Sequence, residues 1–158
     1  MKIARRLKRF GREERGAQLA ELAIVLPIFL LMFGAVAEFG RYFYEYTTLA
    51  KATRAGTRYL ISAKSSAAED AIAKNIVVYG NPAGTGTPVV KGLTPANVVV
   101  TRTGGTPTVP QTVTVEISGY KYQPAFDIGK LLNIPSLSLN VDVKPSMTMR
   151  YLLTQPLL

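Results

Sequence analysis

An apolar run near the start of the chain constrains its fold more than any other feature. Residues 22–37, LAIVLPIFLLMFGAVA, carry no charged or polar side chain. Sixteen residues are somewhat fewer than the ~20 that cross a bilayer as a helix. A window of residues 17–40 is long enough, and only Gln18, Glu21 and Glu38 interrupt it. The run therefore predicts a transmembrane helix over residues 17–40.

A strongly basic segment precedes the run. Residues 1–16 hold seven Lys or Arg residues and two Glu residues, so they contribute seven minus two, or +5, to the net charge of +9. A basic cluster directly before an apolar helix keeps the N-terminus in the cytoplasm. We therefore expect a cytoplasmic leader over residues 1–16, an extracytoplasmic location for everything after about Gly40, and no nucleic-acid partner. The residues expected to set this topology are Arg5, Arg6, Lys8, Arg9, Arg12 and Arg15.

Two kinds of processing fit this N-terminus. Ala35-Val36-Ala37 has the small-x-small pattern of a signal-peptide cleavage site, and a cut there would give a secreted domain. The other interpretation keeps the apolar segment in the membrane and gives Glu21 a function. An ionised carboxylate within the bilayer costs ~2.5 kcal/mol or more, so it needs a partner or a task unless it is solvated at headgroup depth.

A resemblance to a known family covers this region. Residues 16–21, GAQLAE, resemble a type IV prepilin processing site, in which a Gly ends a basic leader and Glu is the fifth residue after the cut. Residues 15–60 resemble the TadE-like pseudopilin (minor pilin) family of tight-adherence (Tad/Flp, type IVc) pilus systems. The apolar run with Pro27, the Glu-Phe-Gly-Arg at residues 38–41, and the aromatic and Ala/Arg-rich stretch that follows carry this resemblance. Leu22 departs from it, because an aromatic residue commonly follows the Glu in such pilins.

The resemblance implies a function and a set of partners. It implies a non-enzymatic minor pilin of the bacterial inner membrane, with its C-terminal domain in the periplasm and a role in assembling a pilus used for adhesion. A prepilin peptidase would cut between Gly16 and Ala17, and the new amine of Ala17 would become a cation near Glu21 in the same or a neighbouring subunit. The implied partners are the inner membrane, the peptidase, other Tad pilins and platform proteins.

Hydrophobic periodicity extends the predicted helix over residues 41–62, beyond the membrane. Apolar and aromatic residues recur there at spacings of three and four, which is typical of one helix face. Such a face packs on its own domain or on a partner, and its own domain is the more frequent case. The periodic residues are Phe39, Tyr42, Phe43, Tyr46, Leu49, Ala50 and Thr53. The candidate subunit-contact residues are Glu21, Phe39, Tyr42, Phe43 and Tyr46.

Residues 63–158 predict a small α+β domain outside the membrane. Ser66, followed by Glu69 in capping-box register, predicts a short helix over residues 65–79. Further along, the apolar period changes to two. This predicts strands over residues 97–103 and 111–118 and a third segment over 136–151, with Pro145 at an edge or bulge, and a short helix at 127–132. The expected fold is pilin-like: a long N-terminal helix, a short helix and an antiparallel sheet of about three strands.

Composition argues against an enzyme. The chain has no His and no Cys, so the usual general base, metal ligand and thiol nucleophile are missing. We expect no catalytic residue, no cofactor, no metal and no small-molecule substrate. Two alternatives to the pilin interpretation remain. A membrane-anchored extracytoplasmic binding domain would keep Met1 and be insensitive to changes at Gly16, whereas a secreted domain would be cut after Ala37.

Overall fold

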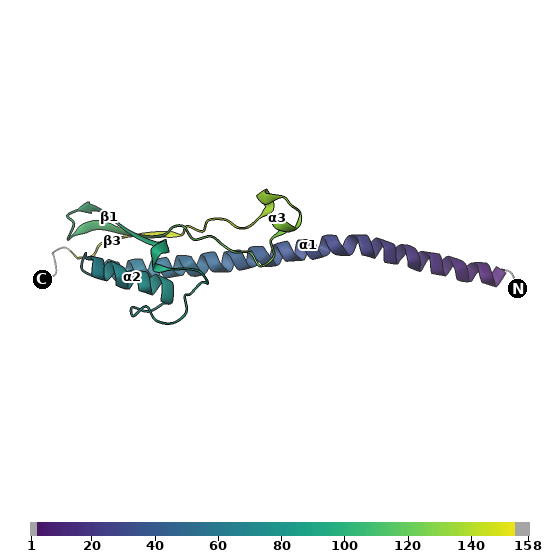
Figure 1. Ribbon diagram of the computed structural model, residues 1–158, viewed down its shortest axis with the longest axis horizontal. Coiled ribbons are helices and arrows are strands. Elements are labelled where there is room, and N and C mark those ends of the chain that lie inside the picture. The colour runs from purple at the N-terminus through teal and green to yellow at the C-terminus, as the bar shows by residue number, and fades with distance from the viewer. Residues whose placement is uncertain (1–2, 154–158) are drawn as a thin grey trace.

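One helix dominates the molecule. The computed structural model describes residues 3–153, with side chains from residue 16 onward. Helix α1 (Ile3–Leu60) is continuous, passes through Pro27 without ending, and extends far beyond the rest of the fold (Figure 1). At 1.5 Å per residue, its 58 residues span about 87 Å. In the described part of the chain, the stretch Gly16–Leu60 is the one helix long and apolar enough to cross a membrane.

A second helix folds back on the outer half of α1. Helix α2 (Ala67–Tyr79) begins two residues later than the predicted range, but its N-cap is Ser66 as predicted, whose hydroxyl accepts a hydrogen bond from the Glu69 N–H at 3.4 Å. The carboxylate of Glu69 does not complete a capping box, because it accepts a hydrogen bond from the Tyr59 hydroxyl on α1. The C-cap is Gly80, in the left-handed conformation that glycine favours (φ 74°).

The sheet has three antiparallel strands in the order β1-β2-β3, which confirms the predicted α+β fold. Strands β1 (Val98–Gly105) and β2 (Pro110–Ile117) pair from Val98 opposite Ile117 to Gly105 opposite Pro110. A single 3-10 turn, η1 (Pro95–Asn97), precedes β1. Strand β1 runs two residues further than predicted, through Gly104 and Gly105, which adopt the positive φ angles that glycine tolerates and lead into a short turn.

The third predicted segment is only partly a strand. Strand β3 (Ser146–Arg150) pairs with β2, but most of residues 136–145 stay outside the sheet, apart from one isolated bridge between Lys121 and Asp142. The strand predicted before Pro145 from the alternation of apolar residues was therefore wrong. Pro145 has no N–H for a ladder, and its carbonyl accepts the Ile117 N–H at 3.0 Å just where β3 begins.

The core lies between the outer half of α1, α2 and one face of the sheet. Alternate residues of β2 point into it, as the period of two predicts. The ion pair between Asp70 of α2 and Arg102 of β1, with N–O distances of 2.5 and 3.0 Å, joins the helix to the sheet. Fully buried members of the core include Leu49, Leu60, Val77, Val113, Val115, Ile117 and Tyr122.

The connection between β2 and β3 runs back along α1 toward the apolar run. It contains α3 (Ile128–Leu131), which confirms the short helix predicted at residues 127–132 and has Asp127 as its N-cap, and a 3-10 turn, η2 (Pro135–Leu137). Figure 1 shows α3 near the middle of α1 and well away from the sheet. This connection brings residues from the second half of the chain to the end of the apolar run.

Candidate functional site

The residues of the predicted processing site lie together on an isolated part of α1. Gly16, Ala17 and Glu21 are all exposed, as is every residue from 16 to 30. A Cβ added at Gly16 would meet nothing within 4 Å. Figure 1 shows this part of α1 extending away from the folded domain. The side chains of the predicted topology residues lie outside the described part of the structure: Arg5, Arg6, Lys8, Arg9, Arg12 and Arg15.

The charged residue at the outer end of the run, Glu38, is buried, with 3% of its surface exposed. Its carboxylate accepts hydrogen bonds from the Tyr122 hydroxyl, from the N–H groups of Ala125 (3.0 Å) and Phe126 (3.2 Å), and from the Arg41 guanidinium (3.4 Å). We call these five residues the Glu38 cluster. A buried carboxylate is costly unless such donors surround it. The cluster therefore both satisfies Glu38 and fixes the connection between β2 and β3 to α1.

A second tyrosine–carboxylate pair lies further out on the same side of α1. The Tyr120 hydroxyl donates to Glu45 at 3.0 Å, seven residues or about two helical turns from Glu38. Burial, followed by the charge of Glu45, raises the pKa of the Tyr120 phenol well above its usual value. Burial and the hydrogen bond to Glu38 raise the pKa of Tyr122 in the same way. Both phenols are thus neutral hydrogen-bond donors at neutral pH.

Sequence reasoning did not find these pairs. Glu38 carried a signal, because an acid at the end of an apolar run needs a partner. Tyr120 and Tyr122 are two residues apart, so in an extended segment their side chains share a face. The sequence does not reveal that this segment crosses α1 at Glu38 and Glu45, because the partners are 84 and 75 residues apart.

The predicted aromatic face divides into two adjacent arcs of α1. Tyr42 packs inward, with its ring perpendicular to that of Tyr122 at a centroid distance of 5.3 Å, and Leu49 and Thr53 are buried. The outer arc holds most of the candidate contact residues and one aromatic that was not predicted. Their exposed fractions are 60% for Phe39, 59% for Phe43, 72% for Tyr44 and 40% for Tyr46. Packing on the chain's own domain therefore occurs for part of this face, and an uncovered aromatic surface lies beside it; packing of that surface on a partner stays a prediction.

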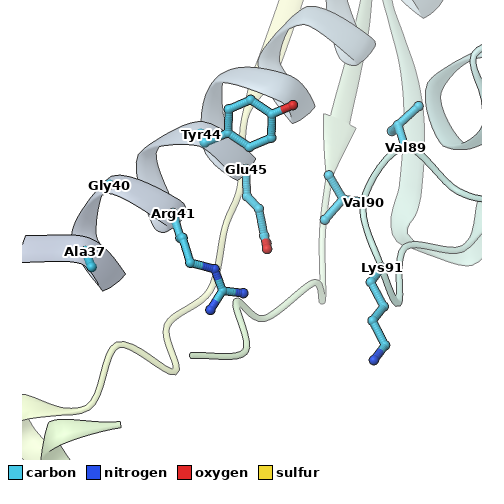
Figure 2. A pocket seen from close by; sticks show the side chains of 8 residues that line it. All are labelled: Ala37, Gly40, Arg41, Tyr44, Glu45, Val89, Val90 and Lys91. Carbon is cyan, nitrogen blue, oxygen red and sulfur yellow. The ribbon is translucent and has the colours of Figure 1, made fainter. Parts of the chain in front are cut away.

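An open pocket lies beside this surface, between α1 and the loop over residues 89–91. Its volume is about 490 Å³, and Figure 2 shows Arg41 and Glu45 extending from α1 toward the space that the loop borders. The pocket is lined by Ala37, Gly40, Arg41, Tyr44, Glu45, Val89, Val90 and Lys91. Between residues 16 and 153, whose side chains the structure describes, no three His, Cys, Asp or Glu residues gather as a metal site would require.

Comparison with known proteins gives one match. Residues 16–58 match the model of a protein family described as TadE-like protein. The matched segment begins at Gly16, includes the apolar run, Glu38 and the exposed aromatic residues, and ends two residues before α1 does. No curated protein and no solved structure matches the chain.

Proposed function

We propose, from the premise that residues 16–58 form a TadE-like segment, that the protein is a minor pilin or pseudopilin of a Tad/Flp (type IVc) pilus system. In this proposal it is a non-enzymatic subunit anchored once in the bacterial inner membrane, with a cytoplasmic leader and an extracytoplasmic domain. It takes part in pilus assembly after a prepilin peptidase removes residues 1–16. The observation that carries the proposal is the position of the match, which starts at the Gly of the candidate cut site.

The geometry of α1 supports this assignment. Side chains from Gly16 to Leu30 are all exposed, so they are available to lipid, to a peptidase and to the anchor helices of other pilins. Glu21 lies on this exposed surface next to the apolar run. In the proposal, the amine of Ala17 that the cut creates pairs with Glu21, in the same subunit or in a neighbouring one, and the exposed aromatic arc adds contacts to Tad pilins or platform proteins.

Processing is tested at Gly16. We expect protein from its native membrane to start at Ala17, as measured by intact mass and N-terminal peptide sequencing. Gly16→Arg should retain the leader, because the peptidase then meets a large charged side chain at the cut. Gly11→Arg adds the same charge within the leader and should be cut normally.

Other N-termini would contradict the proposal in different ways. An intact Met1 in all three proteins would indicate an anchored binding domain without pilin processing. A start at Glu38 would indicate a secreted domain.

Subunit association is tested at Glu21. Glu21→Ala should leave membrane insertion intact or strengthen it, because a charge is removed from the bilayer. It should reduce co-purification of partner pilins by about tenfold, which corresponds to ~1.4 kcal/mol for a lost charge pair. Gln18→Ala, one turn earlier, is the matched control and should co-purify normally. An unchanged yield of partner pilins with Glu21→Ala would show that the carboxylate does not act in association.

A further inference from the structure

The connection between β2 and β3 ends in an apolar tip. We define the tip segment as residues 126–139, which include α3 and η2. Its exposed fractions are 38% for Phe126, 60% for Leu131, 44% for Leu132, 44% for Ile134 and 49% for Leu137. Several exposed apolar side chains within one short segment indicate an interaction site.

The tip segment is nearly free of charge toward solvent. Its two charged residues are Asp127 and Lys130. The Asp127 carboxylate is occupied within the segment, where it accepts the Ser138 hydroxyl at 2.8 Å and the Lys130 N–H at 3.2 Å. The Lys130 side chain is exposed to solvent.

The depth of the tip segment is fixed by contacts with α1. The Glu38 carboxylate accepts the Phe126 N–H, and the Phe126 ring lies against Gly34, where an added Cβ would be 2.6 Å from the ring edge. Gly34 lies within the apolar run, four residues or about 6 Å further into the membrane than Glu38. The tip segment therefore reaches about one helical turn below the end of the run.

An apolar groove separates the tip segment from the anchor. It has a volume of about 390 Å³ and is lined by Ala35, Val36 and Phe39 on α1 and by Ile128, Leu137 and Leu139 opposite. Val36 and Phe39 are also exposed members of the anchor surface. The groove is thus continuous with the surface that a bilayer covers, at the same depth.

We propose that the tip segment lies in the outer leaflet of the membrane, where lipid acyl chains cover its leucines and fill the groove. Interfacial segments bury their apolar face by ~5–10 Å, which agrees with a depth of one turn below the end of the run. Lys130 extends its ammonium group toward the lipid phosphates. The protein then meets the membrane twice, through α1 and through the tip segment. This inference rests on α1 crossing the bilayer and holds whether or not residues 1–16 are removed.

Site-directed spin labelling tests the depth of the tip, because the chain has no native Cys. The full chain carries a nitroxide at Leu131→Cys and is reconstituted at low density in phosphatidylcholine–phosphatidylglycerol vesicles. Collision with oxygen, which concentrates in lipid, is compared with collision with a water-soluble nickel chelate. The controls are Ile24→Cys within the apolar run and Val99→Cys, which is 43% exposed on β1.

We expect the oxygen-to-nickel ratio at Leu131→Cys to be several-fold above that at Val99→Cys and below that at Ile24→Cys. A ratio equal to that at Val99→Cys would place the tip in water and overturn the proposal. Low collision with both reagents would mean that protein, such as a second copy of the chain, covers the tip, and would overturn it as well. Retained leader in protein from its native membrane would count against pilin processing without affecting this result.

Discussion

At the scale of single residues, Glu38 shows what the sequence specifies and what it leaves open. Its place after an apolar run indicates a need for hydrogen-bond donors. One donor, the Arg41 guanidinium, is local, but the other three are a hydroxyl and two backbone N–H groups that lie 84 to 88 residues further along the chain. Local periodicity carries no information on such distant pairs, so the residue was recognisable and its partners were not.

The Tyr122–Glu38 hydrogen bond can be removed alone. Tyr122→Phe keeps the buried ring and leaves a buried carboxylate with one donor fewer, so we expect a loss of ~1–3 kcal/mol in the free energy of unfolding. The measurement is denaturant unfolding of the full chain in detergent, followed by circular dichroism. Tyr44→Phe makes the same change on an exposed ring of α1 and should have little effect. Equal stabilities of the two variants would show that the hydroxyl of Tyr122 does not contribute.

At the scale of elements, the helices and the first two strands followed from pattern and capping, whereas the extent of β3 and the contacts between elements did not. Ser66 predicted the start of α2, and alternation predicted most of β1 and β2. From the sequence alone, the expected effect of Gly56 is only to weaken the helix. In the structure it is buried where α2 packs on α1, and a Cβ there would be 2.5 Å from a methyl group of Val77. This glycine therefore leaves the space that α2 needs to pack closely on α1.

The close packing of α2 on Gly56 predicts that a substitution by Ala has opposite effects at Gly56 and at Gly40. Gly40→Ala meets no atom within 4 Å and should be neutral or stabilise the helix by up to ~1 kcal/mol. Gly56→Ala forces Val77 or α2 to move and should cost ~1–3 kcal/mol through overpacking. Thermal unfolding of the full chain in detergent measures both.

Adding Val77→Ala to Gly56→Ala should restore part of the loss, because the clashing methyl groups are then absent. The double variant should cost less than the sum of the two single variants. Strict additivity would mean that the two residues do not interact.

At the scale of the whole molecule, two tyrosine–carboxylate pairs hold the connection between β2 and β3 along α1. Both phenols have raised pKa values in the folded state. Above about pH 10 the unfolded chain loses these protons while the folded chain keeps them, so stability is complete below pH 10 and falls as the pH rises further.

We expect the free energy of unfolding to decline between pH 10 and 11.5 with a contribution of up to ~1.4 kcal/mol per pH unit from each tyrosine. Denaturant unfolding of the full chain in detergent at a series of pH values measures the slope. The Tyr120→Phe/Tyr122→Phe variant should be less stable at neutral pH but show a flatter decline. An equally steep decline in this variant would assign the alkaline sensitivity to other groups.

The continuity of α1 has a geometric consequence for the orientation of the domain. The same helix crosses the apolar run and enters the core, from Ile3 to Leu60. Any rotation of the anchor about its own axis therefore turns the sheet by the same angle. Deleting one residue from the run would swing the domain by about 100° and draw it about 1.5 Å closer to the membrane. The direction in which the outer domain faces and its height above the membrane are thus coupled, because both are set by the number of residues between Glu21 and Glu38.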